Sequence, residues 1–463
     1  MTTHTPSRHD RQTVPEPTGR RRRDRGGRRG RRSVTLVVAA SLTLGFVAAW
    51  VLILGVFPGA DESTTTGSAL LAYGLGWAAL WLGSIRYTDQ PQRWAAVPAT
   101  FMGLSGLALL VVSPRQDALA VLTWVWPPLV LALVVWMWAQ MRRHLTGRGR
   151  WLLTPVFVFL AVASIGATVE NVLVQQERAA FPAPGKTYEV DGRRVHLDCH
   201  GQGGPTVVLF NGMGEISSSW GRISEPVSKT TRVCAYDRAG QAWSDDAPVP
   251  QDGVQAVADL HQVLAEAGEQ GPFVLTGHSI GGLYAMTYAQ QHPGEVAGMV
   301  LLDSTSPHQF TAVPAYPGQY AMLRRTYSLL TTLSRLGTGH LTAGTSQTDA
   351  HGDQVRAMSS MPREARNIRD ESATLPTTMD EAQRLTTLHG APLVVVTASE
   401  SLEGEGWGAA QDAIAKLSDN VAHREVRSSH MGLIDDEQHT RDSVRAVLDV
   451  VTAVRTGQSL DDR

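Results

Sequence analysis

A serine within a glycine-rich segment is the residue of this chain best suited to chemistry. Residues 277–282 read Gly-His-Ser-Ile-Gly-Gly, so Ser279 has one glycine two positions before it and another two positions after it. Small residues at these positions permit a very tight turn, and such a turn can present a serine hydroxyl as a nucleophile. A glycine-rich turn without a catalytic role has the same pattern, so the flanking elements must decide between the two readings.

A serine nucleophile requires a base that removes its proton. Of the fifteen histidines, His430 has the most suitable position, because it follows the last predicted strand and precedes the last predicted helix. It also comes after Ser279 in the chain, which is the order required where such serine turns follow a strand of a parallel sheet. The alternative is an ordinary histidine in a loop.

The base in turn needs an acid that accepts its other imidazole proton and fixes the tautomer. Asp303 follows the strand predicted at Gly298–Leu302, and Glu400 follows the strand predicted at Leu393–Thr397. We favour Asp303 slightly, because the loop after the second of these strands is long and rich in glycine. Asp303 also suits a purely structural role as a turn cap, and Glu400 remains the alternative.

Two backbone amides are expected to stabilise the negative charge that develops on a substrate oxygen. One is the amide of Ile280, directly after the serine. The other is the amide of Met213, in the glycine-rich loop of residues 211–214, Asn-Gly-Met-Gly. We refer to residues 211–214 as the oxyanion loop, although an Asn-Gly pair is also common in plain turns.

These residues must be positioned by the elements around them, and from about Pro182 onward strands and helices alternate. Such alternation is typical of a mostly parallel sheet covered by helices on both faces. The strand Phe273–Thr276 precedes Ser279 and the helix Gly282–Gln291 follows it, as a nucleophilic serine turn requires. The other expected strands are Tyr188–Val190, Arg194–Cys199, Thr206–Phe210, Arg232–Tyr236, Gly298–Leu302, Leu393–Thr397 and Ala422–Val426, and the other expected helices are Gly253–Ala267 and Arg441–Arg455.

Together these segments resemble the α/β-hydrolase superfamily, in the branch of serine esterases and lipases. The resemblance extends from Thr187 to Val454 and includes residues 233–245 before the serine turn and residues 292–303 after it. It implies an α/β-hydrolase fold that acts without a metal or an organic cofactor. One departure lies in the oxyanion loop, where many relatives have His-Gly and this chain has Asn211-Gly212. A serine in the turn, rather than an aspartate, argues against the epoxide hydrolase and haloalkane dehalogenase relatives.

The resemblance also implies a helical lid, which we place at about residues 307–390, with helices near Tyr320–Leu336 and Asp380–Leu388. In this fold the second and fourth strands are neighbours. Cys199 ends the second and Cys234 lies in the fourth, so these two cysteines can form a disulfide if the domain lies outside the cytoplasm. Two buried thiols are the alternative.

The first third of the chain has a different composition and predicts a membrane region. A bilayer core of about 30 Å needs roughly 20 apolar residues per helix. Five runs qualify or nearly do so: Val34–Phe57, Ser68–Ile85, Ala95–Ser113, Ala118–Met141 and Trp151–Val169. The chain is therefore expected to divide into a basic, disordered cytoplasmic tail (residues 1–33), a transmembrane region (residues 34–173) and a hydrolase domain (residues 182–463).

Basic residues in the short loops predict the orientation of these helices. Arginines dominate the head before Val34 and the loops of residues 86–93 and 142–150, whereas the loop of residues 58–67 has two acids and no base. This distribution places the head inside and, after five crossings, the C-terminal domain outside the cytoplasm. We therefore expect a multi-pass protein of the cell membrane, and we attribute the basic head to topology and lipid contact rather than to nucleic-acid binding.

The expected function is hydrolysis of a small or lipid-like ester through an acyl-serine intermediate. An acyltransferase with the same residues is a close variant. From other classes come an inactive hydrolase-fold domain that binds or senses a ligand, and a channel or transporter formed by the five runs. The scarcity of charged residues inside the runs argues against transport.

Overall fold

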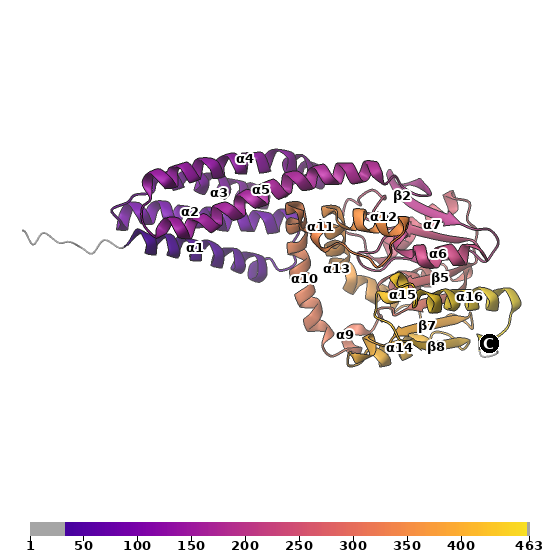
Figure 1. Ribbon diagram of the computed structural model, residues 1–463. Coiled ribbons are helices and arrows are strands. Elements are labelled where there is room, and N and C mark those ends of the chain that lie inside the picture. The colour runs from indigo at the N-terminus through magenta and orange to yellow at the C-terminus, as the bar shows by residue number, and fades with distance from the viewer. Residues whose placement is uncertain (1–32, 461–463) are drawn as a thin grey trace, which may run out of the picture.

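The computed structural model describes residues 33–460, and it combines an elongated bundle of helices with a C-terminal α/β domain (Figure 1). The basic head, expected to be a disordered cytoplasmic tail, lies outside the described residues except for Ser33. The bundle contains α1 (Val34–Trp50, continued by a π-helical segment to Val56), α2 (Glu62–Tyr87), α3 (Ala96–Val112), α4 (Gln116–His144) and α5 (Gly149–Ala180).

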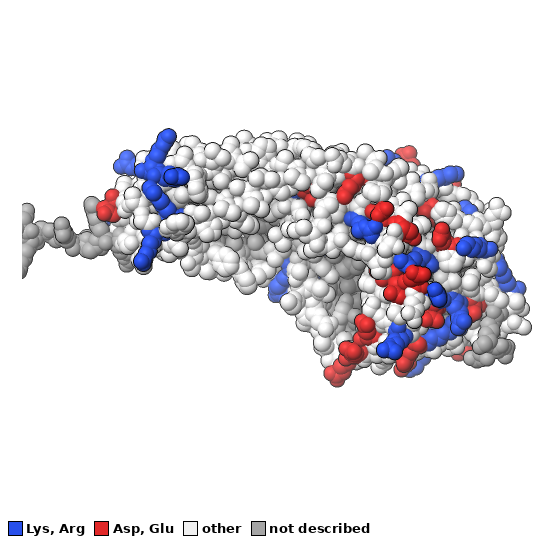
Figure 2. Space-filling view, viewed as in Figure 1, with Lys and Arg blue, Asp and Glu red and all other residues white. Residues whose placement is uncertain are grey.

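Five segments of this bundle are long and apolar enough to cross a membrane: Val34–Val56, Glu62–Tyr87, Arg93–Val112, Ala118–His144 and Gly149–Ala180. Large apolar side chains along them point outward, among them Phe46, Leu104, Val135 and Phe159. Figure 2 shows the surface of the bundle almost without charge, with basic residues gathered at the end away from the α/β domain. The expectation of five membrane-type helices is confirmed by their length and composition.

Glycines bring the helices α2 and α3 into close contact. A Cβ atom on Gly74 would lie 2.6 Å from the backbone nitrogen of Gly103, and one on Gly106 would collide with the backbone of Leu71. Helix pairs in membranes are commonly held together by such close packing of small residues, because lipid gives no hydrophobic force between helices. The bundle is therefore assembled in the way expected for an environment of lipid.

An eight-stranded sheet forms the centre of the C-terminal domain, in the order β1-β2-β4-β3-β5-β6-β7-β8. Strands β1 and β2 pair antiparallel, as do β2 and β4, and every later pair is parallel. The strands are β1 (Lys186–Val190), β2 (Arg193–His200), β3 (Val207–Phe210), β4 (Val233–Asp237), β5 (Phe273–His278), β6 (Val296–Leu302), β7 (Leu393–Ala398) and β8 (Val421–Val426). The carboxyl ends of the parallel strands meet at one edge, which is where ligands bind to open α/β sheets.

Both faces of the sheet are covered by helices. Successive residues of a strand point to opposite faces, so Val208 and Phe210 join one hydrophobic core while Val207 and Leu209 join the other. The first core packs under α7 (Gly253–Glu266) and α8 (Gly281–Gln291), and the second packs under α6 (Gly221–Ser228) and α16 (Thr440–Thr456). The remaining helices after β7 are α14 (Trp407–Ala415) and α15 (Gly432–Asp435).

Helices between β6 and β7 form the lid. They are α9 (Gln309–Ala312), α10 (Tyr316–Leu333), α11 (Gly339–Thr342), α12 (Ala350–Ser359) and α13 (Pro362–Ala382). The first expected lid helix corresponds to α10, but the second, Asp380–Leu388, is wrong. The helix there is α13, which begins at Pro362 and ends at Ala382, because the polar and charged side chains along it obscured the apolar stripe that contains Leu375 and Met379.

The lid is attached to the membrane helices as well as to its own domain. Arg335, between α10 and α11, pairs with Glu62 at the start of α2, with Nη2 and Oε2 2.9 Å apart. His340 on α11 lies between two carboxylates of α5, with Nδ1 2.8 Å from Glu170 and Nε2 3.0 Å from Glu177. The lid therefore forms the contact layer between the two parts of the chain, and Figure 1 shows α10 and α11 at this junction.

The two cysteines face each other on neighbouring antiparallel strands. Cys199 on β2 is the register partner of Cys234 on β4, and the two are joined by a disulfide. The sequence left a disulfide and two buried thiols as alternatives, and the structure contains the disulfide.

Candidate active site

Ser279 lies on the sharp turn between β5 and α8, at the carboxyl edge of the sheet. Its φ angle is +54°, in the left-handed region that residues with a side chain seldom occupy. The Ser279 amide donates to the Leu302 carbonyl at 3.2 Å, and its carbonyl accepts from the Thr305 amide at 2.9 Å. A Cβ atom on Gly277 would lie 2.6 Å from the Gly281 backbone, so this turn requires the glycine. The turn therefore has the strained backbone geometry in which a serine hydroxyl can be presented as a nucleophile.

His430 follows β8 and lies beside this turn. Its ring is 4.5 Å from the ring of His278, measured between centroids, and its carbonyl accepts a hydrogen bond from His278 Nε2 at 3.0 Å. Its Nδ1 atom is 2.6 Å from Oδ2 of Asp303, which leaves Nε2 as the atom available to a substrate or to the serine. The structure thus brings a histidine and an aspartate together beside His278, the residue that precedes Ser279.

Asp303 is fully buried at the end of β6 and has several hydrogen-bond donors. Besides His430, it accepts from Ser401 Oγ at 2.5 Å, Trp407 Nε1 at 2.9 Å and the Ala398 amide at 3.2 Å. Burial alone would raise the pKa of Asp303, but the hydrogen bond and charge of His430, with help from Ser401 and Trp407, hold it below its ordinary value. The carboxylate is therefore charged at neutral pH and suited to orient an imidazole and stabilise its protonated form.

Glu400, the alternative acid, is placed differently. It is exposed at the end of β7, and its side chain makes no hydrogen bond or ion pair with His430 among the contacts of the described residues. The loop after β7 instead contributes Ser401 and Trp407 as donors to Asp303. The geometry favours Asp303 over Glu400 as the partner of the histidine.

The two amides expected to bind the oxyanion come from α8 and the oxyanion loop. Within the described part of the chain, neither the Ile280 amide nor the Met213 amide donates a hydrogen bond to another residue. Buried amides are nearly always paired, so two unpaired amides next to a serine turn are available to a ligand. Gly214, which follows Met213, has a φ of +75° that lets the loop turn sharply.

Asn211, which replaces the histidine of many relatives, supports the oxyanion loop from below. Its side chain donates to the Tyr236 carbonyl at 2.9 Å and to Gln241 at 3.1 Å, and accepts from Trp220 at 2.9 Å. It is fully buried. The polar atoms of its side chain are thus all paired inside the domain. The replacement of histidine by Asn211 therefore affects the residues that support the oxyanion loop.

An ion pair that the sequence did not reveal holds the same loop. Arg238, after β4, donates to the carbonyls of Asn211 at 2.7 Å and Gly212 at 3.1 Å, and it pairs with Glu371 of α13 at 2.6 Å. Both side chains are almost completely buried. The oxyanion loop is therefore tied to the lid helix α13 through one guanidinium.

A second unexpected pair joins the oxyanion loop to the serine turn. His278 Nδ1 contacts Glu215, and the other carboxylate oxygen of Glu215 accepts from the Gly212 amide at 2.5 Å. Burial lowers the pKa of His278, but the charge and hydrogen bond of Glu215 outweigh it and raise the pKa above its ordinary value. His278 is part of the sequence motif around Ser279, but no local pattern predicts Glu215 as its partner. The two residues lie in distant segments of the chain and meet only in the folded structure.

Comparison with known proteins identifies the fold. Residues 205–389 match a family model described as the alpha/beta hydrolase fold. The C-terminal part has the α/β-hydrolase fold. The expected fold class is thereby confirmed, with five membrane-type helices in front of it.

Relatives of the hydrolase domain include proteins named as hydrolases. An uncharacterized protein of Schizosaccharomyces pombe is 28% identical over 346 residues, which cover 66% of this chain and 61% of that protein. A 2-hydroxy-6-oxononadienedioate/2-hydroxy-6-oxononatrienedioate hydrolase of Paraburkholderia xenovorans is 32% identical over 135 residues, 27% of this chain and 46% of that protein. The chain thus spans less than two thirds of the length of either relative. The solved structure of a variant of aCif, with 14% identity and a TM-score of 0.50, covers 61% of this chain and 96% of its own, and shares the fold.

Proposed function

We propose that this protein is a membrane-anchored serine hydrolase that cleaves an ester through an acyl-serine intermediate. The observation that carries the proposal is the 2.6 Å contact between His430 and the buried Asp303, beside a serine on a strained turn. A histidine oriented by a carboxylate next to a serine is the arrangement that activates a hydroxyl for acyl transfer.

The mechanism follows from the roles of these groups. His430 Nε2 removes the Ser279 proton as the hydroxyl attacks the ester carbonyl, and Asp303 stabilises the imidazolium that forms. The Ile280 and Met213 amides hold the oxyanion. His430 then gives its proton to the leaving alcohol, and water, activated by the same histidine, releases the acid from Ser279.

A small or lipid-like ester is the proposed substrate class. The support is the location of the site under a lid that contacts the ends of membrane helices, where lipid-derived molecules are close. Hydrolysis needs no group beyond these side chains and water, so the proposal includes no cofactor.

Labelling with a fluorophosphonate probe tests the nucleophile. Membranes that contain the full-length chain are expected to show a labelled band, and Ser279→Ala is expected to abolish the label, because the probe reacts only with an activated serine hydroxyl. Ser228→Ala, at the end of α6, is the matched control and should label like the wild type. A folded, membrane-inserted wild-type protein that is not labelled would contradict the catalytic proposal and favour a ligand-binding role.

We further propose that the protein spans the cell membrane five times and that its hydrolase domain faces away from the cytoplasm. The basic loops of residues 86–93 and 142–150 lie at the end of the bundle away from the domain (Figure 2), which fits the preference of basic loops for the cytoplasmic side. The Cys199–Cys234 disulfide fits an oxidising compartment.

Reporter fusions test this orientation. Alkaline phosphatase fused after the hydrolase domain is expected to be active, and green fluorescent protein fused at the same position is expected to be dark. The same reporters fused within the loop of residues 142–150 should give the reverse pattern. A fluorescent, phosphatase-negative C-terminal fusion would place the domain in the cytoplasm and overturn the orientation.

A further inference from the structure

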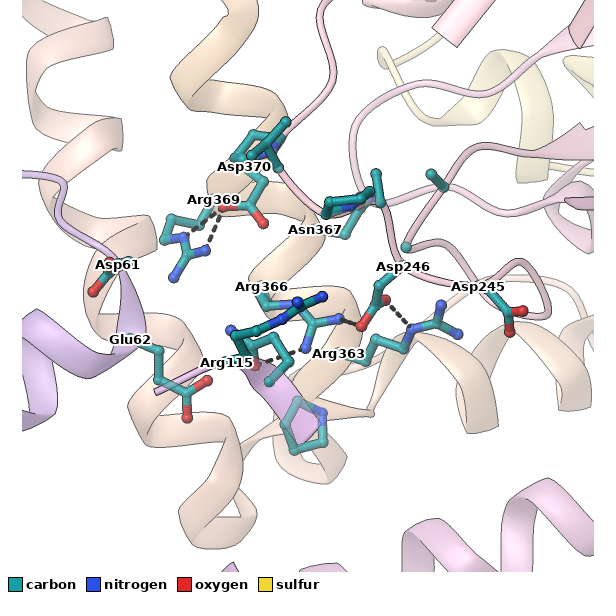
Figure 3. A pocket seen from close by; sticks show the side chains of 18 of the residues that line it. Asp61, Glu62, Arg115, Asp245, Asp246, Arg363, Arg366, Asn367, Arg369 and Asp370 are labelled. Atoms are coloured by element: carbon teal, nitrogen blue, oxygen red, sulfur yellow. Dashed lines mark hydrogen bonds and ion pairs between the residues drawn. The ribbon is translucent and has the colours of Figure 1, made fainter. Parts of the chain in front are cut away.

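A large cavity lies between the membrane helices and the hydrolase domain, apart from Ser279 and His430. Its volume is about 1070 Å³, and its walls come from the loop before α2, the start of α4, α5, the loop after β4 and α13. Ligand pockets are commonly about 300–1,000 Å³. Figure 3 shows its charged side chains, among them Asp61 and Glu62 from the helical bundle and Arg366 and Arg369 from α13.

Three arginines of α13, at a spacing of three residues, line one wall of this cavity: Arg363, Arg366 and Arg369. Among the described residues, two carboxylates pair with them. Asp246 is shared, at 2.7 Å from Arg363 and 2.5 Å from Arg366, and Asp370 pairs with Arg369. Three guanidinium groups against two carboxylates leave this wall with a net positive charge.

The pairing of Arg369 is incomplete. The residue is 5% exposed, and its Nη1 atom is buried without a hydrogen-bond partner in the part of the chain that the structure describes. Its other two nitrogens contact Asp370, and Figure 3 shows the third pointing away from Asp370. An unpaired buried donor on a charged group is costly, so a wall that served only to join the two domains would be expected to satisfy it.

The chemistry of this wall suits an anion with several oxygens. Guanidinium groups bind phosphate through paired N–H donors, and they do so better than lysine because of their planar geometry. Burial lowers the pKa of Arg366, and the charge of Asp246 opposes this effect. The cavity also lies at the ends of the apolar helices, the level at which lipid headgroups are found.

We propose that this cavity binds the phosphate group of a phospholipid headgroup or a soluble phosphate ester, through Arg366 and Arg369. The unpaired nitrogen of Arg369 supplies a free donor, and Arg366 supplies a second guanidinium on the same wall.

Helix α13 connects this cavity to the oxyanion loop through Glu371 and Arg238, which also line the cavity. Glu371, two residues after Arg369, pairs with Arg238, which holds the carbonyls of Asn211 and Gly212. Ile368 packs against Gly214 of the same loop. An anion bound by Arg366 and Arg369 thereby fixes the helix that holds the oxyanion loop and raises the reactivity of Ser279. This coupling, unlike the binding site itself, rests on the proposed function.

Calorimetric titration of the full-length protein in phosphate-free maltoside detergent tests the site. The Ser279→Ala protein is titrated with dihexanoyl-phosphatidylglycerol, with glycerol 3-phosphate and with dihexanoylglycerol, which lacks phosphate. Saturable binding of dihexanoyl-phosphatidylglycerol alone identifies a lipid headgroup as the ligand. Equal binding of dihexanoyl-phosphatidylglycerol and glycerol 3-phosphate identifies a soluble phosphate ester. Absence of binding by both, or equal binding of dihexanoylglycerol, overturns the proposal.

Substitutions locate the binding site. Arg369→Gln is expected to weaken binding of the phosphate ligand about tenfold or more, because it removes a charged donor pair. Arg384→Gln, an exposed arginine just beyond α13, is the matched control and should bind like the parent protein. If Arg369→Gln fails to fold, as judged by its melting temperature, Arg366→Gln takes its place. Unchanged affinity in a folded variant overturns the site.

The coupling has a separate measurement. With Ser279 intact, the phosphate ligand is expected to accelerate fluorophosphonate labelling several-fold, and Arg369→Gln should remove this acceleration. Binding without acceleration overturns the coupling and leaves the site. If Ser279 is never labelled, the proposed function fails, whereas the titrations still decide the binding site.

Discussion

Exchange of Asp303 for asparagine is expected to lower kcat for a p-nitrophenyl ester by a factor of about 10³ to 10⁴, the size of effect found when a triad aspartate is replaced. Asparagine leaves the space filled but removes the negative charge that stabilises protonated His430, and it favours the wrong imidazole tautomer. Steady-state kinetics of the purified full-length protein measure the change. KM should alter much less than kcat, because the lost interaction belongs to the transition state.

Glu400→Gln is the matched control for this experiment. It removes the same charge at the other candidate position, and its kcat should stay within about twofold of the wild type, because the exposed side chain does not contact His430. Melting temperatures of both variants separate catalytic effects from unfolding. A large loss in Glu400→Gln together with a small loss in Asp303→Asn would assign the acid to Glu400.

A second large effect is expected on stability, from the replacement of Glu364 by glutamine. Glu364 is 2% exposed in the first turn of α13, and one of its carboxylate oxygens has no hydrogen-bond partner among the described residues. Burial, followed by the charges of Glu371 and Asp237, raises the pKa of Glu364 to about 8 from an ordinary value of 4.5. The folded protein therefore keeps a proton that the unfolded chain releases, and stability is lost as the pH rises from about 4.5 to about 8.

Glutamine removes this penalty because it is neutral in both states. At about 1.36 kcal/mol per pKa unit, Glu364→Gln should raise the free energy of unfolding by about 2 kcal/mol at pH 6 and about 4 kcal/mol at pH 8, with little change at pH 4. Thermal or denaturant unfolding in detergent at these three pH values measures the difference. Glu405→Gln, an exposed glutamate, should show no such trend. A gain that does not grow with pH would show that Glu364 is ionised in the folded protein.

Local patterns were sufficient to predict the parts of the molecule that depend on local rules. Hydrophobic length predicted the five membrane-type helices, and the strand before Ser279 and the helix after it were predicted to within two residues. The serine turn could be predicted because tight backbone geometry requires glycine at fixed distances from the serine. Each of these features is encoded by a pattern within about 25 consecutive residues.

The lid helix α13 could not be predicted in the same way. Its buried face includes charged residues, among them Glu364, Arg366, Arg369 and Glu371, which are buried because they have partners or shifted protonation. A search for apolar periodicity reads such a helix as exposed or irregular. A helix such as α13, whose charged residues are buried by ion pairs with distant segments, therefore lacks the apolar pattern from which a helix is predicted.

The choice between Asp303 and Glu400 stayed open for a related reason. Both follow a strand of the parallel sheet, so local pattern assigns both to the same edge. What separates them is the set of donors around Asp303, namely Ser401, Trp407 and His430, which come from two loops more than ninety residues away. The supports of the oxyanion loop, Glu215 and Arg238, depend on long-range contacts in the same manner.

Helix α5 has a consequence for the mechanics of the whole protein. Its 32 residues form a rod of about 48 Å. If α5 spans a bilayer core of about 30 Å, as proposed, about 18 Å of continuous helix extend beyond the lipid. His340 of the lid contacts this helix near its C-terminal end, at Glu170 and Glu177. On this proposal, the C-terminal domain is held at a fixed height above the membrane, without a flexible tether. Helices adjust their tilt to bilayer thickness, and a change in the tilt of α5 moves the lid with it.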